Sequence, residues 1–418
     1  MVTAFVDMVG LLMVVPLLPF VATRLGGGGL VVGLLVSSFS LAQLLSAPLW
    51  GRFSDRYGRR PALLVGLSAA AMAYVVFAYA DSLWLLLLSR LVQGAGGGTV
   101  GVIQAYVVDS VEGKDRAKAL GWLSAATNLG VMIGPVLGSS SLALGPRAPG
   151  LLAAVLCLGN IAFAFLYLRE SRQPAPHDDG PARPTVRPRE AVMHVLTHPG
   201  EAAPRLIWIY AIGMGALFGF TAVLALFLKA HFGVTEHTVG WVFTWNGAVS
   251  VLARAVVLGK MLDRFGEARL ARFGQALLLA GLALVPFTWR FHPGWTLPLF
   301  GWEVEPRIVL LGLVIALIPL GTAFTFPCVT GLLSQVIEPR ERGVMMGVQQ
   351  SYGGAARVFF PLLAGWTFQH MGTGYPFWTS AVLVLGTFVL SFGIGPRREE
   401  EPPAARKEEE GVAVAATG

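Results

Sequence analysis

Apolar residues run along this chain in long stretches that are separated by short polar segments. A helix needs about 20 apolar residues to cross the hydrocarbon core of a bilayer. The chain offers twelve such windows, at residues 2–23, 31–51, 62–80, 83–108, 118–140, 149–168, 205–229, 238–259, 270–289, 307–330, 343–368 and 375–395. The pattern therefore predicts an all-α polytopic membrane protein with twelve transmembrane helices.

The longest polar stretch divides these windows into six and six. It covers residues 169–204 and is rich in Pro, Arg and Asp, which is typical of a solvated linker with at most a short amphipathic helix near Glu190–His198. The predicted organisation has four parts: a six-helix bundle at 1–168, a cytoplasmic linker at 169–204, a second six-helix bundle at 205–395 and a disordered tail at 396–418. The first residues lack a basic region and a cleavage site, so we expect no removable signal peptide.

The composition excludes an ordinary soluble protein. Of the 418 residues, 55% are hydrophobic and only 13% are charged, against about 25% charged residues in globular chains. The mean hydropathy is +0.65. Cys157 and Cys328 both lie in apolar windows, which excludes a disulfide framework and a cysteine-ligated zinc site.

Lys and Arg predict the orientation of the chain. With the N-terminus inside, the inside loops and tail hold 23 of the 31 basic residues, the outside loops hold 5, and 3 fall within windows. The positive-inside rule then places both termini in the cytoplasm, which suits a multi-pass protein of a plasma (bacterial inner) membrane. The net charge of +7 therefore comes from these loops and predicts no nucleic-acid partner.

The two halves of the sequence resemble each other. The pattern Gly-x-x-x-Asp-Arg-aromatic-Gly follows the second window at Gly51–Gly58 and the eighth at Gly259–Gly266. Arg116–Gly138 aligns without gaps on Arg342–Ala364. Two repeated six-helix bundles with a site between them near the midplane are the architecture of many secondary transporters.

Four segments carry a resemblance to a known family. The loop GRFSDRYGRRP, at residues 51–61, resembles the signature of the major facilitator superfamily. Arg90–Gly97 resembles the family's second motif, and Asn128–Gly138 is similar to the motif associated with its antiporters. Asp7–Gly10, followed by Pro16–Pro19, resembles the first span of the twelve-helix drug:proton antiporter branch, which includes tetracycline exporters.

The loop motif has two interpretations. Its arginines are typical of topogenic charge, but Asp55 serves no positive-inside purpose and recurs as Asp263. The resemblance implies a cytoplasmic latch in which Arg59 joins Asp55 and Asp109. Such a latch would stabilise the outward-open state and break when the halves rock; a merely structural ion pair is the alternative. The implied gating set is Gly51, Asp55, Arg56, Gly58, Arg59, Arg60, Asp109, Asp263 and Arg264.

Gly130, Gly134 and Gly138 recur every four residues in the fifth window, and Pro135 should kink that helix. Small residues at this spacing let two backbones approach closely in lipid. Tight packing alone would explain them, whereas the resemblance implies a seal against leak. In the second half the last two glycines become Phe360 and Ala364, so we expect an asymmetric seal.

Asp7 and Arg90 are the candidate proton-coupling residues. Asp7 is the only acidic residue clearly inside a window. Burial disfavours the charged form of a carboxyl group and a nearby arginine favours it, so such a residue can be tuned to take up and release a proton. A position near the end of a short first span is the alternative for Asp7, and a structural partner for a carbonyl or carboxylate is the alternative for Arg90.

Further polar and aromatic residues within windows could line a substrate cavity, although core or lipid-facing packing is the alternative for each aromatic. They are Gln43, Gln93, Asn128, Tyr210, Trp245, Asn246, Gln349, Gln350 and Tyr352. The seven histidines lie in loops or at window ends without metal-ligand spacing, so no metal site is predicted. We see no phosphate loop, nucleotide motif or catalytic triad.

These patterns predict a proton-coupled exporter of small lipophilic or amphipathic organic molecules, and not an enzyme. Its partners would be the substrate, protons and the lipid bilayer, with no cofactor, and it would act as a monomer. A facilitator or symporter of the same fold is one alternative. A membrane scaffold or enzyme is another, but the linker at 169–204 lacks the clustered polar groups of a catalytic loop.

Overall fold

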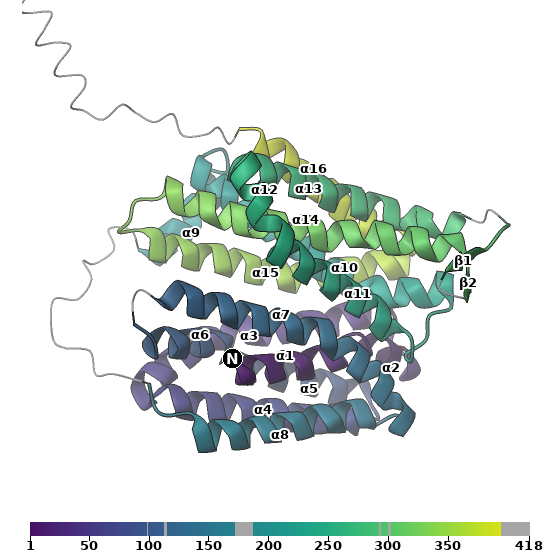
Figure 1. Ribbon diagram of the computed structural model, residues 1–418, viewed down its shortest axis with the longest axis horizontal. Helices are drawn as coiled ribbons and strands as arrows, with labels where there is room; N and C mark the ends of the chain where they lie inside the picture. Colours follow the sequence, from purple (N-terminus) through teal and green to yellow (C-terminus); the bar gives the residue numbers. More distant parts are fainter. Residues whose placement is uncertain (98, 113–114, 172–186, 292–293, 300–301, 394–418) are drawn as a thin grey trace, which may run out of the picture.

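The computed structural model places a helix over each of the twelve predicted windows (Figure 1). The structure describes residues 1–97, 99–112, 115–171, 187–291, 294–299 and 302–393. The predicted tail at 396–418 and part of the predicted linker lie outside these ranges. The prediction of an all-α polytopic fold is confirmed, with one short hairpin added to it.

The helices of the first half have the following bounds: α1 (Val2–Val14), α2 (Leu18–Arg24), α3 (Gly29–Tyr57), α4 (Arg59–Ala78), α5 (Leu83–Gly96), α6 (Thr99–Asp109), α7 (Arg116–Ser141) and α8 (Ala148–Tyr167). The first window is broken into α1 and α2 by a turn at residues 15–17, which contains Pro16 and is followed by Pro19. Proline lacks a backbone donor and disfavours an uninterrupted helix, which explains the break.

The linker forms α9 (Pro188–Thr197), and the second half continues with these elements: α10 (Ala202–Phe232), α11 (Val239–Leu252), α12 (Leu258–Phe265), α13 (Glu267–Leu284), β1 (Leu297–Leu299), β2 (Trp302–Val304), α14 (Pro306–Val336), α15 (Arg342–His370) and α16 (Tyr375–Ser391). A π-helical turn, Ala253–Val257, joins α11 to α12. β1 and β2 pair antiparallel, with Leu297 opposite Val304.

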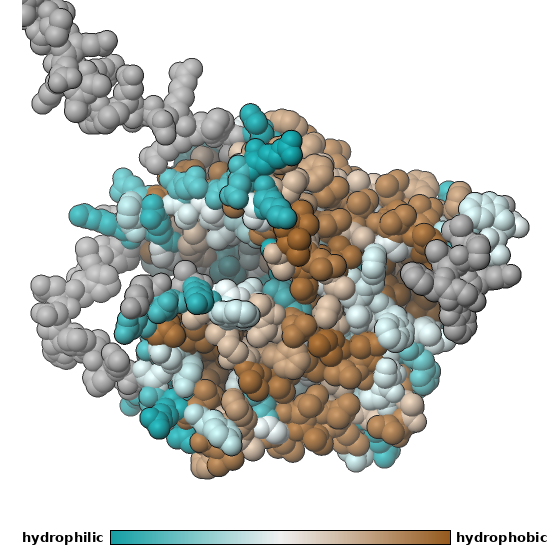
Figure 2. Space-filling view, in the orientation of Figure 1, coloured by the Kyte–Doolittle hydropathy of each residue, from teal (hydrophilic) through white to brown (hydrophobic). Residues whose placement is uncertain are grey.

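Ten helical segments of the described residues are long and apolar enough to cross a membrane. The two remaining predicted spans are α15, which carries Gln349, Gln350 and Arg357, and α16, which has 17 residues. Apolar side chains cover much of the face drawn in Figure 2, as expected where lipid replaces water. The chain is therefore a multi-pass membrane protein.

The helices of the two halves form two groups that lie side by side (Figure 1). α9 lies at one end of the helices, here called the linker side. The β1–β2 hairpin lies at the other end, here called the hairpin side. α3 of the first group packs on α15 of the second, and α7 packs on α11, so these four helices form most of the contact between the groups. α10 adds smaller contacts with α2 and α3.

Candidate functional site

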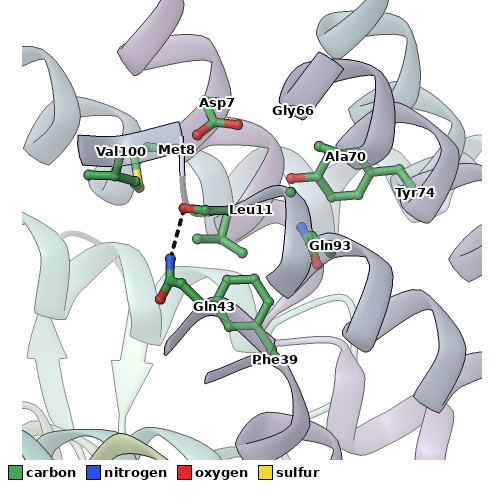
Figure 3. A pocket seen from close by; sticks show the side chains of 12 residues that line it. Asp7, Met8, Leu11, Phe39, Gln43, Gly66, Ala70, Tyr74, Gln93 and Val100 are labelled. Carbon is green, nitrogen blue, oxygen red and sulfur yellow. Dashed lines mark hydrogen bonds between the residues drawn. The ribbon is translucent and has the colours of Figure 1, made fainter. Parts of the chain in front are cut away.

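A small cavity inside the first half brings three of the predicted residues together. Asp7, Gln43 and Gln93 line it, from α1, α3 and α5 (Figure 3). The Gln43 side chain is held by a hydrogen bond from its Nε2 to the Gly97 carbonyl, 3.1 Å away. Tyr74 of α4 completes the polar lining. The cavity therefore collects polar groups from four helices in an otherwise apolar interior.

Arg90 lies just outside this lining and is only 2% exposed. Its guanidinium donates a hydrogen bond to Gln93 Oε1 and lies 5.9 Å from the ring centroid of Phe39. Its Nε has no hydrogen-bond partner among the described residues, and none of their carboxylates lies within ion-pair distance of it. A buried cation without a carboxylate partner is costly, which makes this region a functional candidate.

The size of the cavity limits what it can hold. Its volume is about 30 Å³, the space of about two water molecules, whereas sites for drug-sized ligands measure about 300–1,000 Å³. In this conformation the Asp7 cavity therefore has room for a proton carrier and for water, and not for an organic substrate.

The loop between α3 and α4 forms a charged cluster on the linker side. Arg59 Nε donates to Asp109 at 3.0 Å, and Arg59 Nη1 donates to Asp55 at 2.6 Å and to Ser54 Oγ at 3.0 Å. Gly58 has φ 105°, a conformation that other residues rarely adopt. The structure thus joins the ends of α3, α4 and α6 through a single guanidinium.

Other residues of the loop motif hold the turn in place. Backbone N–H groups of Arg59 and Arg60 donate to the Glu170 carboxylate at 2.8 and 3.1 Å, and the Arg60 side chain donates to the Phe165 carbonyl. The Arg56 guanidinium lies over the Tyr57 ring. Gly51 faces open space. Every partner named here belongs to the first half or to the start of the linker.

The corresponding loop of the second half is built differently. Asp263 and Arg264 are both exposed. The position equivalent to Arg59 is Glu267, and the position equivalent to Asp109 is Gln335. Gln335 Nε2 donates to Glu267 Oε2 at 2.9 Å, so the repeat keeps a contact at this place while the ion pair is absent from it.

The glycines of the fifth span contact α1. A side-chain carbon added to Gly130 would lie 2.7 Å from the Phe5 carbonyl, and one added to Gly134 would lie 2.8 Å from Leu12 Cβ. A carbon on Gly138 would overlap the Met13 carbonyl. Pro135 lies inside α7. The three glycines therefore form a groove in which the backbone of α1 lies.

The two groups of helices are in close contact on the hairpin side. A side-chain carbon added to Gly33 of α3 would overlap the Pro361 carbonyl of α15, and one added to Gly240 of α11 would overlap the Pro135 carbonyl of α7. Ser37 Oγ donates to the Val358 carbonyl at 2.5 Å. Arg24 forms an ion pair with Glu236, and Lys229 donates to Thr23 Oγ1 at 3.3 Å. These contacts close the interface at this end.

The same four helices separate on the linker side. At this end α3, α7, α15 and α12, which follows α11, each carry a glycine for which an added side-chain carbon would have no atom within 4 Å. These glycines are Gly51, Gly121, Gly347 and Gly259. Figure 2 shows a hollow between the two groups near this end. The structure is therefore closed on the hairpin side and open on the linker side. The Arg59 cluster is intact in this state, so it does not depend on closure of the linker side.

The remaining predicted cavity residues are not gathered around Asp7. Their contacts are as follows: Asn128 Oδ1 accepts from Arg254 Nη1 at 3.0 Å, Tyr210 Oη accepts from Gln350 at 3.3 Å, Gln349 donates to Thr330 at 3.3 Å, Tyr352 donates to the Val192 carbonyl at 2.9 Å, Trp245 donates to the Gly312 carbonyl at 2.9 Å and Asn246 donates to the Val242 carbonyl at 3.2 Å. Of these contacts, only that between Asn128 and Arg254 links the two halves.

Three groups of interest were not among the predicted site residues. Tyr74 could not be told from a packing aromatic, because it lies in a plain apolar window. Arg254 lies in the π-helical turn, a feature often found at functional sites. His194, His198 and Glu201 come together at the end of α9, an arrangement that was not predicted from the sequence. The signal was available, because residues four apart share a helix face.

Comparison with known proteins agrees with this architecture. A sequence model described as "Major Facilitator Superfamily" matches residues 1–230 and 206–417. The chain is 26% identical over 393 residues to "Tetracycline resistance protein, class B" of Escherichia coli, covering 92% of this chain and 91% of that one. It is 27% identical over 380 residues to "Multidrug resistance protein 1" of Bacillus subtilis (strain 168), covering 90% of each.

Solved structures show the same fold. The crystal structure of the human organic anion transporter MFSD10 (TETRAN) matches with a TM-score of 0.64 and 24% identity, covering 93% of this chain and 97% of that one. The nucleoside transporter NupG matches with a TM-score of 0.71 and 16% identity, covering 94% and 97%. At these identities the likeness is one of fold.

Proposed function

This chain belongs to the major facilitator superfamily, and we propose that it exports small lipophilic or amphipathic organic molecules in exchange for protons. The observation that carries the proposal is the cavity lined by Asp7. Among the described residues, Asp7 is the one acidic side chain more than four residues from either end of its helix. Relatives named for resistance to tetracycline and to multiple drugs support export of organic compounds.

The proposed exchange is energetically sufficient with one proton. A single charge that moves through about 150 mV releases roughly 3.5 kcal/mol. That free energy supports a concentration gradient of a neutral solute of several hundred-fold. One titrating carboxyl group such as Asp7 therefore meets the requirement, provided that its proton uptake alternates with substrate binding.

Opening on the linker side fits the uptake step of such an exporter. We place the linker side in the cytoplasm, with both termini there, because the basic residues concentrate in its loops. In the proposed cycle two six-helix bundles, at 1–168 and 205–395, rock about their contact as a monomer in a plasma (bacterial inner) membrane. The open ends of α3, α7, α12 and α15 would admit substrate from that side.

The role proposed for the Arg59 cluster follows from where its partners lie. Asp55, Arg59 and Asp109 all belong to the first half. Rocking of two rigid halves leaves such contacts unchanged, in contrast to a latch that must break. We propose that the cluster holds the linker-side ends of α3, α4 and α6 in one arrangement while the bundle moves.

The test is transport into everted membrane vesicles, with a panel of lipophilic compounds and a pH-sensitive dye. The wild-type chain should accumulate at least one compound when a proton gradient is imposed, and should release protons from the vesicles. Asp7→Asn should abolish this accumulation while substrate binding or exchange remains measurable, because the amide cannot titrate. The matched control is Asp81→Asn, at an exposed loop position, which should transport normally. Undiminished proton-driven accumulation by Asp7→Asn would remove Asp7 from the mechanism.

A further inference from the structure

The linker helix α9 is attached to the second half by one of its faces. Ala191 and Val195 are buried, at 2% and 0% exposure. Trp208 of α10 donates to the Val195 carbonyl at 3.2 Å, and Tyr352 of α15 donates to the Val192 carbonyl at 2.9 Å. These contacts fix the rotation of α9, so the residues on its other face have a defined direction.

Two histidines and a glutamate meet on that exposed face. His194 and His198 are one helical turn apart, and their rings stack with centroids 4.6 Å apart. Glu201 directly precedes α10, and its Oε2 lies 2.8 Å from His194 Nε2. One ligand atom from each of the three residues lies within 4.8 Å of the other two. The cluster thus joins the end of α9 to the beginning of α10.

The chemistry of these donors suits a transition-metal ion. Two imidazoles and a carboxylate, with a fourth position open to water, are a common zinc ligand set. Metal-to-ligand distances of about 2.0–2.2 Å would bring the ligand atoms within roughly 3.5 Å of one another. All three side chains are exposed, so small rotations of the side chains can close the remaining difference.

A second residue orients one of the ligands. Thr197 Oγ1 lies 2.8 Å from His198 Nδ1. A histidine whose Nδ1 is engaged in this way presents Nε2 to a metal, and such outer contacts tune affinity. This contact would not be needed by a surface ion pair between His194 and Glu201.

We propose that His194, His198 and Glu201 bind one divalent transition-metal ion, with zinc as the fitting member, and that the ion clips α9 to the first turn of α10. The proposal does not rest on the transported substrate or on proton coupling. It assigns to the linker a site that lies beside the open linker side of the interface.

The experiment is a titration of the purified full-length chain in detergent, carrying an affinity tag without histidine. Isothermal calorimetry with Zn²⁺ should give one site, and Co²⁺ should give the visible absorption of a nitrogen- and oxygen-ligated ion. Mg²⁺ should not compete. His194→Asn and His198→Asn should each weaken binding at least tenfold. Thr197→Val should weaken it about tenfold, within the range of effects of outer contacts.

The matched control is His370→Asn, which removes an exposed histidine at the hairpin-side end of α15. It should bind zinc like the wild type. All variants are checked for an unchanged elution volume, which separates a loss of ligands from a loss of fold. Equal zinc affinity in His198→Asn and the wild type, or an equal loss in His370→Asn, would mean adventitious binding only and would overturn the proposal.

Discussion

The two halves of this protein keep the same helix contacts with different residues. In the first half, Leu12 of α1 packs against Gly134 of α7. In the second half the equivalent of Gly134 is Phe360, and its ring packs on Gly215 of α10. The large and the small residue have exchanged helices. The repeat therefore preserves the pairing of a large side chain with a glycine rather than the residue type at each position, as close packing requires.

Charge does not follow the same rule. The first half places a guanidinium between two carboxylates on the linker side, whereas the second half has an amide and a carboxylate at the equivalent place. Asp7, Arg90 and their cavity also belong to the first half. Packing is thus shared between the halves, and the polar groups with a candidate role in coupling are concentrated in one of them.

The largest expected effect tests the exchanged packing. Gly134→Leu adds four carbon atoms against Leu12, and overpacking costs about 1–3 kcal/mol. Because α1 and α7 belong to the same half, the added bulk should push α1 out of its groove and displace Asp7, which α1 carries, from its cavity. We expect Gly134→Leu and Gly215→Leu to insert normally and to lower transport about tenfold or more. Phe360→Leu, which shortens a side chain in the same place, should keep most activity.

Lipid-facing glycines provide the controls for this prediction. Gly159 in the first half and Gly386 in the second have no atom within 4 Å of an added carbon, and both are exposed. Leucine at either position should leave transport unchanged. Transport that falls as much with Gly386→Leu as with Gly215→Leu would mean that side-chain bulk, and not the helix contact, causes the loss.

A smaller effect should separate the two linker-side loops. Asp109→Asn leaves Arg59 bonded to Asp55 and Ser54, and partly exposed ion pairs contribute about 0.2–1 kcal/mol each. We expect a small drop in thermal stability, and a larger one in the double variant Asp55→Asn/Asp109→Asn. Gln335→Met, at the equivalent place, should change stability less than either. The measurement is the unfolding temperature in detergent together with the transport rate; a larger drop for Gln335→Met would contradict the asymmetry.

The smallest effect concerns the ion pair that joins the halves on the hairpin side. The side chains of Arg24 and Glu236 are 50% and 27% exposed, so their contribution should stay within about 1 kcal/mol. Glu236→Gln should shift the population toward opening on that side by a few-fold at most. Spin-label distances between the hairpin-side ends of α2 and α11 would report the shift. The charge-reversed pair Arg24→Glu/Glu236→Arg should return it; no recovery would argue against a direct pairing.

Hydropathy predicted the spans because burial in lipid demands long apolar helices, whatever their partners. It could not predict which way a polar residue within a span points. Trp245 and Tyr352 bond to backbone carbonyls of α14 and α9, and no local pattern in the sequence distinguishes these directions from a cavity. Gln43 and Gln93 lie in the same cavity as Asp7 because α1, α3 and α5 pack in one particular rotation.

Two local features depend on turns whose backbone path the sequence pattern does not determine. The first window reads as one continuous span, yet Pro16 lies in a turn that separates α1 from α2. The histidine cluster needs the short turn between α9 and α10 to bring Glu201 back toward His194. In both places the apolar pattern is satisfied by more than one backbone path, and tertiary packing selects the path.

The π-helical turn at Ala253–Val257 accounts for a mismatch in the repeat. Gly33 and Gly240 contact equivalent prolines, and Gly51 and Gly259 each begin the repeated Gly-x-x-x-Asp-Arg-aromatic-Gly pattern. Gly33 and Gly51 are 18 residues apart in α3, which is about five helical turns. Gly240 and Gly259, their equivalents in the second half, are 19 residues apart. One inserted residue would rotate everything after it by about 100°. The π-helical turn accommodates the additional residue. The second half is therefore one residue longer, and the residues after the turn keep the orientation that their equivalents have in the first half.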